Sequence, residues 1–224
     1  MPGFARLLGD VGERFLNRTQ PGLEAQLANL ADAIAYNNHD VDDGVRAGLI
    51  AVDDLLDVRV FSRFHAIVVA RYPELPPRRV LYETIRRMVD YLVSDVITQS
   101  QKNIVDSSVD SIQAVRAHSR PLISLSENVL SEHQELKRFL RTKLYNHPSV
   151  REVMDEAGAT LKGLFEAYMK EPSRLPPEHQ SLFERAESGG GRAAAARVVA
   201  DYVAGMTDRF AYQERDKLTL SRGS

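Results

Sequence analysis

Apolar residues recur at intervals of three and four along almost the whole chain, and this pattern restricts the fold more than any other feature. The clearest stretch lies within residues 80–97, where the apolar residues are Val80, Leu81, Ile85, Met88, Leu92, Val96 and Ile97. Such a stripe is typical of one buried face of a long helix. The two-residue alternation of a half-buried strand does not persist anywhere. The sequence therefore predicts an all-α fold of about eight to ten helices around an aliphatic core, without a sheet.

Prolines, glycines and polar stretches divide the helical pattern into segments. Asp42-Asp43-Gly44 predicts a break after a helix over residues 22–38. Ser188–Gly191 predicts a flexible linker rather than a phosphate cradle, because the Gly-Lys-Ser/Thr of a P-loop is missing. Residues 104–124 predict a loop that contains one short helix. The other expected helices cover residues 1–17, 60–71, a long segment from 77, 127–143, 149–170, a short segment near 182, and 192–212.

Composition narrows the class of protein. The 224 residues suffice for one large domain or two small ones, and 43% apolar with 27% charged residues is an ordinary globular balance. A net charge of −2 gives no general attraction to nucleic acid or anionic lipid. The absence of cysteine excludes disulfides and thiolate metal sites. No apolar run approaches the ~20 residues of a membrane span, and we expect a cytoplasmic protein without a membrane partner.

Asp32, Tyr36 and Asp40 follow one another at intervals of four residues. Four residues of α-helix turn through about 400°, so each side chain is displaced by only about 40° from the one before. The three polar groups therefore form one slowly rotating stripe on a helix with apolar neighbours. A buried aspartate in such a helix needs a cation, and a metal ion or a metal-bound phosphate meets that need. A solvated helix face fits the same spacing, and both interpretations stay open.

Three blocks of the sequence, taken in order, resemble the dGTP triphosphohydrolase family, which belongs to the HD-domain phosphohydrolases. The first runs from Leu23 through Ala31-Asp32-Ala33-Ile34-Ala35-Tyr36 and His39-Asp40 to Gly48, the second spans 136–147, and the third is the stretch 201–211. The resemblance extends over roughly residues 22–215.

This resemblance implies an all-α fold and hydrolysis of dGTP or another dNTP to a deoxynucleoside and triphosphate. It also implies a homo-oligomer. Three regions are expected on this basis. Residues 1–20 form a non-matching N-terminal helix, residues 21–110 form the remainder of an HD-type helical domain, and residues 111–224 form a phosphohydrolase-associated C-terminal subdomain.

The resemblance also implies roles for residues of the stripe. Asp32 matches the aspartate that completes the family's metal site, which suits Mn, Mg, Fe or Zn. Tyr36 and Asp40 match positions that line the triphosphate pocket, and Asp40 is expected to act by pairing with a cation or through water. Candidate supporting residues beside them are His39, Asp43 and Arg46.

Three of the four metal ligands implied by the resemblance are missing. The family's first histidine and its His-Asp pair lie upstream of the closing aspartate, so His39-Asp40 is not that pair. All six histidines follow Asp32; they are His39, His65, His118, His133, His147 and His179. We therefore expect the C-terminal portion of a triphosphohydrolase, inactive alone, without a tightly bound metal, and associating with itself or with a complementing chain. A truncation, a split gene product and a degenerate paralogue all fit this expectation.

A second class of function also fits, namely a non-catalytic helical module that binds nucleotide, nucleic acid or a protein partner. Two basic clusters are relevant to it: Arg78, Arg79, Arg86 and Arg87, and Lys137, Arg138, Arg141 and Lys143. Each is either a solvated helix face or a contact for nucleotide or single-stranded nucleic acid. His65 lies among apolar residues and is expected to be a packed core histidine.

Overall fold

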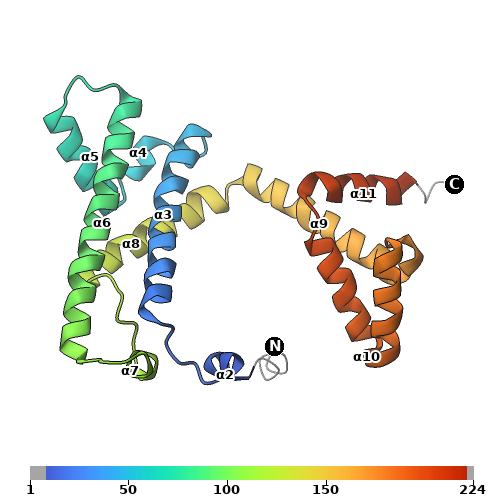
Figure 1. Cartoon of the computed structure of the whole chain (residues 1–224). Coiled ribbons are helices and arrows are strands. Elements are labelled where there is room, and N and C mark those ends of the chain that lie inside the picture. Colours follow the sequence, from blue (N-terminus) through green and yellow to red (C-terminus); the bar gives the residue numbers. More distant parts are fainter. Residues whose placement is uncertain (1–8, 221–224) are drawn as a thin grey trace. The chain divides into compact units, whose positions relative to one another are not determined.

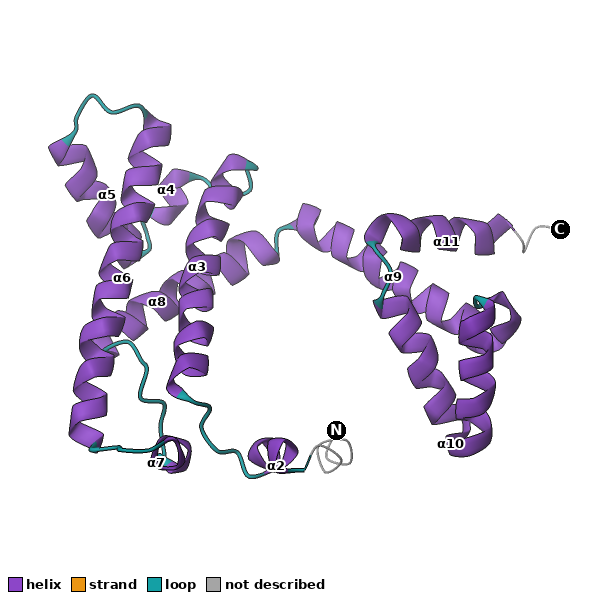
Figure 2. Cartoon of the chain, in the orientation of Figure 1, coloured by secondary structure: helices purple, strands orange, loops and turns teal. Residues whose placement is uncertain are grey.

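The computed structural model describes residues 9–220, and this part of the chain is helical without any strand (Figure 1; Figure 2). The all-α prediction is confirmed. Residues 1–8 of the expected N-terminal helix lie outside the described residues. In the described range, no helix has the length and apolar character needed to cross a bilayer. The elements are α2 Asp10–Leu16, α3 Leu23–Arg46, α4 Val52–Leu55, α5 Arg59–Arg71, α6 Pro77–Ser107, α7 Ile112–Ala117, α8 Glu127–Leu140, the π-helical turn η1 Arg141–Tyr145, α9 Pro148–Lys170, the 3-10 turn η2 Pro172–Arg174, α10 Pro177–Ala204 and α11 Asp208–Leu220.

The chain divides into two compact units between His147 and Pro148. The first unit contains α2 to α8 and η1, and the second contains α9 to α11 and η2. This division follows packing in space. The boundary expected between residues 110 and 111 is based on the family resemblance and not on packing, and it stays a prediction.

Four helices, α3, α5, α6 and α8, form the frame of the first unit. Helix α6 packs against α3 and α5, and α8 packs against the same two helices. The apolar stripe predicted for α6 faces this frame, since Met88 and Leu92 are 0% and 1% exposed. At the end of the stripe Ile97 is 54% exposed. The predicted buried face is therefore confirmed for most of its length and is wrong at Ile97.

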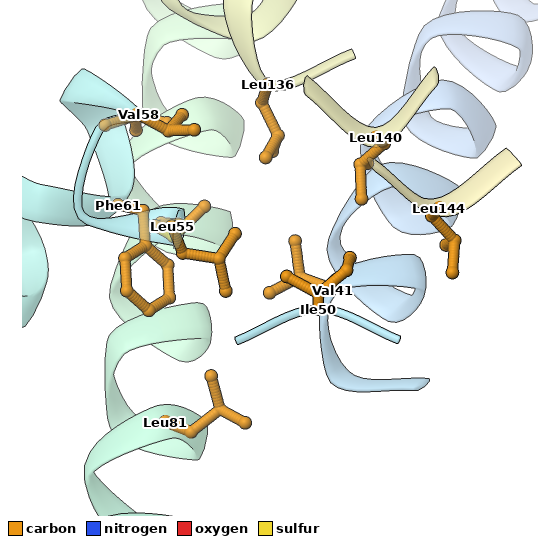
Figure 3. Packing of buried hydrophobic residues seen from close by; sticks show 11 residues of the cluster. Val41, Ile50, Leu55, Val58, Phe61, Leu81, Leu136, Leu140 and Leu144 are labelled. Atoms are coloured by element: carbon orange, nitrogen blue, oxygen red, sulfur yellow. The ribbon is translucent and has the colours of Figure 1, made fainter. Parts of the chain in front are cut away.

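Side chains from these helices, from α4 and from η1 converge on one core (Figure 3). Its buried members are Val41, Ile50, Leu55, Val58, Val60, Phe61, Leu81, Met88, Leu136, Leu140 and Leu144. Complete burial of one such side chain stabilises the fold by about 1.5–3 kcal/mol relative to exposure. Helix α3 contributes Val41 to this core and Ile34 to a neighbouring one with Leu92 and Val96. The middle and the C-terminal part of α3 are thus held by apolar packing.

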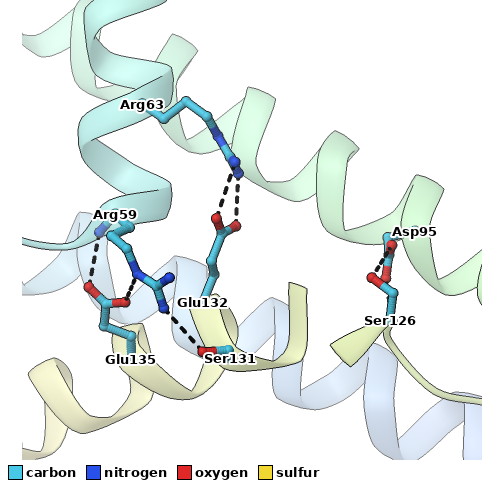
Figure 4. Close-up of polar contacts among 7 residues, drawn as sticks. All are labelled: Arg59, Arg63, Asp95, Ser126, Ser131, Glu132 and Glu135. Carbon is cyan, nitrogen blue, oxygen red and sulfur yellow. Dashed lines mark hydrogen bonds and ion pairs between the residues drawn. The ribbon is translucent and has the colours of Figure 1, made fainter. Parts of the chain in front are cut away.

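Charged and polar side chains fix α8 against its neighbours (Figure 4). Arg63 of α5 donates two parallel hydrogen bonds, of 3.1 and 2.8 Å, to the carboxylate of Glu132. Asp95 of α6 accepts hydrogen bonds from the backbone N–H and the hydroxyl of Ser126, both at 2.7 Å. Because Ser126 immediately precedes α8, the Asp95 carboxylate fixes where that helix begins.

The break expected at Asp42-Asp43-Gly44 is wrong, because α3 continues to Arg46. Gly44 serves close packing instead of a turn. A Cβ atom on Gly44 would lie 2.6 Å from Cδ1 of the buried Ile50. The chain turns four residues later, at Gly48, whose φ of 71° is the left-handed conformation that glycine adopts readily. The carbonyl of Gly44 accepts from the N–H of Ile50 at 3.1 Å, which satisfies the end of the helix.

The flexible linker expected at Ser188–Gly191 is also wrong in most of its length. Helix α10 contains Ser188, Gly189 and Gly190 within its helical run, and only Gly191 departs from helical geometry, with φ 70° and ψ −170°. Figure 1 shows that the two arms of α10 meet at an angle at this point. One glycine with positive φ is enough to redirect the chain, so a tight kink replaces the linker.

The loop expected over residues 104–124 is confirmed after Ser107, where α6 ends, and its short helix is α7. The side-chain amides of the buried Gln26 and the partly buried Asn103 hold the segment that follows α7. The Gln26 side-chain oxygen accepts from the backbone N–H groups of Leu122 and Ile123, at 2.8 and 3.1 Å. Asn103 donates to the Leu122 carbonyl at 3.0 Å. These bonds satisfy backbone groups that a buried loop leaves without helical partners.

The second unit has a core of its own, formed by α9, η2, α10 and α11. Its buried members are Leu164, Tyr168, Leu175, Phe183, Ala195, Val199, Val203 and Ala211. The ring of Tyr168 is fully buried, and its hydroxyl donates to Glu214 at 3.0 Å. Burial and this carboxylate raise the pKa of Tyr168, so the phenol stays protonated.

Candidate functional site

Helix α3 turns Asp32 and Tyr36 outward. Its opposite face carries Ile34 and Val41, which are 3% and 0% exposed and fix the rotation of the helix. Asp32 is exposed, Tyr36 is 62% exposed, and Asp40 is half-buried. The surroundings of the stripe therefore change from open to partly enclosed between Asp32 and Asp40.

Asp40 has a partner that the stripe itself does not contain. The Tyr145 hydroxyl donates a hydrogen bond to Oδ2 of Asp40. Tyr145 is the last residue of η1, and the adjacent Leu144 anchors this turn in the core. Burial, and then the bond to Asp40, raise the pKa of Tyr145 to about 12. The tyrosine therefore stays protonated at neutral pH and is a permanent hydrogen-bond donor to Asp40.

Sequence reasoning missed this role of Tyr145. The resemblance predicts a cation or a water as the partner of Asp40, and the structure places the phenol of Tyr145 at Oδ2. A signal was available, since Tyr145 belongs to the second of the three blocks that resemble the family. The structure adds an indication that the sequence does not show: Tyr145 lies on a π-helical turn, and such turns occur often at functional sites.

The three candidate supporting residues lie on the exposed face of α3. His39, Asp43 and Arg46 are all exposed. Within residues 9–220, no side-chain hydrogen bond or ion pair is made by any of them. The structure brings none of the three into contact with Tyr145, and their supporting role stays a prediction.

A buried polar pair lies behind the stripe, between α3 and α8. Asn37 Nδ2 and His133 Nε2 are 3.3 Å apart, and the two residues are 6% exposed each. Next to them, Asn38 Nδ2 donates to the carbonyl of Ile34 at 2.8 Å. Burial, and then the charge of Lys137, lower the pKa of His133. A neutral imidazole accepts from Asn37 and so fixes the orientation of α3, which carries Tyr36.

A metal site depends on the donor side chains that the described residues bring together. No group of three or more histidine, aspartate, glutamate or cysteine side chains able to hold a metal ion occurs within residues 9–220. Asp32 offers one carboxylate, and catalytic metal sites take three protein ligands or more. The described residues therefore do not fit a complete metal centre.

Residues 123–217 match the model of a family described as a phosphohydrolase-associated domain. Together with the fold, this match defines the class: the protein is all-α and carries a segment that is similar to phosphohydrolase-associated domains.

Three relatives narrow the class to a family. The chain is 45% identical to the deoxyguanosinetriphosphate triphosphohydrolase-like protein of Thiobacillus denitrificans, over 96% of this chain and 54% of that protein. It is 47% identical to the protein of the same name from Bordetella pertussis, over 96% of this chain and 53% of that protein. It is 45% identical to the protein of the same name from an Azoarcus species, over 96% of this chain and 54% of that protein. The chain belongs to the deoxyguanosinetriphosphate triphosphohydrolase-like family and spans about half the length of these relatives.

Proposed function

We propose that this chain is part of a metal-dependent triphosphohydrolase, which splits dGTP or another dNTP into a deoxynucleoside and triphosphate. The observation that carries the proposal is the outward stripe of Asp32, Tyr36 and Asp40 on α3, in a chain 45% identical to triphosphohydrolase-like proteins. Asp32 would give one carboxylate to a divalent metal, Mn, Mg, Fe or Zn, whose other ligands lie outside the described residues. The metal, when bound, polarises phosphoryl oxygens and activates water.

In this proposal the remaining residues act on the substrate. The exposed Tyr36 hydroxyl donates to a phosphate oxygen. Asp40 would repel phosphate if it stood alone. Its Oδ2 accepts a hydrogen bond from Tyr145, and in this proposal its other oxygen, Oδ1, pairs with a cation or a water instead of the phosphate itself. The enclosed end of the stripe would therefore position the substrate.

The chain by itself is expected to bind metal weakly and to turn over little or no substrate, since Asp32 provides a single ligand. The test incubates the whole chain with dGTP and Mn²⁺ and follows triphosphate release by ³¹P NMR. Sustained release of triphosphate by this chain alone would overturn the expected incompleteness. The proposed activity itself is tested in a chimera in which residues 22–215 replace the matching segment of the Thiobacillus relative.

The chimera should release triphosphate whenever the parent relative does, and Asp32→Asn should abolish that release. Thr98→Ala on α6, whose hydroxyl contacts only a carbonyl of its own helix, is the control. A folded chimera whose Asp32→Asn variant keeps full activity would contradict the assignment of Asp32.

A non-catalytic helical module that binds nucleotide, nucleic acid or a protein partner is the second candidate. It is favoured by a cavity at the α5–α6 turn that is lined by arginine and tyrosine. A melting-temperature shift with dGTP that needs Mn²⁺ and Asp32 supports the first candidate. A shift that needs neither supports the second. Self-association is proposed for either one, and light scattering on the whole chain checks it.

A further inference from the structure

One side of α9 is open to solvent along most of the helix. Helices α10 and α11 pack against α9, and Leu164 and Tyr168 belong to the core that the three helices share. Another side carries two parallel rows of side chains with Gly158 between them. The apolar row is Val150, Met154, Leu161 and Phe165, and the charged row is Arg151, Asp155, Lys162 and Glu166. Intervals of four and seven residues keep each row on its own side of the helix.

The apolar row is poorly covered. Met154 and Leu161 are 62% and 46% exposed, and Val150 and Phe165 are half-buried. Apolar side chains aligned along one helix are typical of a face on which another element packs. Within residues 9–220, no helix covers Met154 or Leu161 to the extent that the core residues of α9 are covered. The row therefore fits a partner that comes from outside the described chain.

Gly158 lies between the two rows, near the middle of α9. A Cβ atom at this position would meet no atom within 4 Å, so packing inside the described part of the chain does not explain why a side chain is lacking. Glycine is unfavourable in a helix interior relative to alanine. It is used where another backbone approaches closely. Gly158 thus indicates the point at which a second helix crosses α9.

The charges of the charged row alternate in sign from Arg151 to Glu166. Read in the opposite direction, the row has the opposite charge at every place. Within residues 9–220, Arg151 and Asp155 make no ion pair and no side-chain hydrogen bond. Lys162 and Glu166 are 3.9 Å apart, with side chains that are 78% and 63% exposed, so their mutual pairing is weak. The row is therefore free to pair with a copy of itself that runs in the opposite direction.

Both rows place the crossing at the same residue. In two antiparallel copies, Arg151 lies opposite Glu166 and Asp155 opposite Lys162, and the midpoint of both pairs falls directly after Gly158. In the apolar row, Met154 lies opposite Leu161 and Val150 opposite Phe165, and their midpoint falls directly before Gly158. In a parallel pair, each charge would instead face its own copy, and like charges would repel. The sequence of this face therefore favours the antiparallel arrangement.

We propose that this face of α9 binds the same face of a second copy of the chain, with the two helices antiparallel and crossing at Gly158. Such a contact is isologous, so each charge pair occurs twice. It extends over residues 150–166, about 25 Å of helix. One helix pair buries less than the roughly 1,200 Å² of a standard stable interface, so the dimer depends on concentration. This inference rests on the self-association proposed above, for which it specifies the surface and the orientation.

Sedimentation equilibrium of the whole chain, from about 5 to about 200 μM, measures the dimer directly. Arg151→Glu should weaken dimerisation about tenfold or more, because each dimer gains two contacts between like charges. The double variant Arg151→Glu/Glu166→Arg should restore it, since the sign of both partners is exchanged. Lys170→Glu makes the same change of charge at an exposed residue on another side of α9, and it should dimerise as the wild type does.

The crossing point is tested by cross-linking, because the chain contains no cysteine. Gly158→Cys lies at the two-fold axis and should form a disulfide with its own copy under mild oxidation. Gly163→Cys is the matched control, since Gly163 is also a glycine of α9 whose added Cβ would meet no atom within 4 Å. It lies away from the axis and should cross-link about tenfold more slowly, because two cysteines must approach closely to be bridged.

The proposal is overturned if Arg151→Glu sediments like Lys170→Glu, if the double variant does not recover, or if Gly163→Cys cross-links as fast as Gly158→Cys. A chain that dimerises equally in every variant would keep the proposed self-association and assign it to another surface. A chain that stays monomeric at the highest concentration would contradict both. Asp32→Asn should dimerise like the wild type, so failure of the triphosphohydrolase proposal leaves this result unaffected.

Discussion

The hydroxyl of Tyr145 donates a hydrogen bond to Oδ2 of Asp40 across 105 residues of sequence. It joins the inner end of the stripe on α3 to the π-helical turn that follows α8. Asp40 is thereby the one member of the stripe with a hydrogen-bond partner for its side chain within residues 9–220. A geometry that is fixed before substrate arrives lowers the cost of ordering the site on binding.

Removal of this donor should have a measurable but modest effect. Tyr145→Phe is expected to lower the free energy of unfolding by about 0.5–1.5 kcal/mol, the net value of one hydrogen bond. Urea unfolding of Tyr145→Phe, Asp40→Ala and the double variant gives the coupling free energy between the two side chains. Tyr36→Phe is the matched control, because the exposed Tyr36 hydroxyl has no hydrogen-bond partner within residues 9–220. A coupling of zero would show that the contact does not form in solution.

The same contact should be visible at alkaline pH. The folded pKa of Tyr145 is about 12, raised from an ordinary value of 10.0. Since the raised pKa favours the protonated phenol, its contribution to stability is complete below pH 10 and is lost as the pH rises through 12. The difference in tyrosinate absorbance between wild type and Tyr145→Phe should therefore have its midpoint near 12. A midpoint near 10 would contradict the assignment.

His133 should make the fold sensitive to acid. Burial lowers its folded pKa below the ordinary value of 6.5, so the unfolded chain takes up the proton more readily. The contribution of the neutral His133 to the free energy of unfolding is therefore complete above pH 6.5. It is lost as the pH falls through 6.5 toward the lower pKa of the folded state. Urea unfolding between about pH 8 and pH 5 should show a smaller loss of stability in His133→Gln than in the wild type. Thr98→Ala, which removes no titratable group, serves as the comparison and should lose as much stability as the wild type.

Two glycines inside helices should respond to alanine with opposite signs. Gly44→Ala is expected to destabilise the protein by about 1–3 kcal/mol, because the new methyl overlaps the buried Ile50. Gly158→Ala in α9 meets no atom within 4 Å and should stabilise by up to about 1 kcal/mol through helix propensity. Thermal unfolding of both variants checks this. Equal effects at the two positions would mean that Gly44 is not tightly packed.

The ion pair of Arg63 and Glu132 should contribute more than an exposed pair. Its carboxylate is 13% exposed and accepts two hydrogen bonds, and the guanidinium also lies 4.5 Å from the centre of the Tyr91 ring. Glu132→Gln should cost about 1 kcal/mol, the upper end for exposed ion pairs. Glu166→Gln breaks the exposed pair with Lys162, at 3.9 Å, and should cost less than about 0.5 kcal/mol. Urea unfolding that ranks the two variants in the reverse order would contradict this.

The sequence by itself predicted most of the long elements as helices, although the one helix expected over residues 192–212 ends at Ala204 and a separate helix, α11, begins at Asp208. Helical periodicity depends on which residues share a face within a few turns, and that is a local property. It predicted the buried face of α6 through Met88 and Leu92 and the common stripe of Asp32 and Tyr36 on α3. Three blocks in family order also predicted the family.

Tertiary structure decided where helices end and which distant side chains meet. Gly44 stays helical and packs against Ile50, although Asp42-Asp43-Gly44 suggested a break. Only Gly191 breaks α10, although the whole segment Ser188–Gly191 suggested a linker. Asp40 meets Tyr145 only after α3, α8 and η1 pack around Leu144. Contacts between residues so far apart arise from the burial of shared apolar surface, and the periodicity of one segment carries no information on the partner that this burial selects.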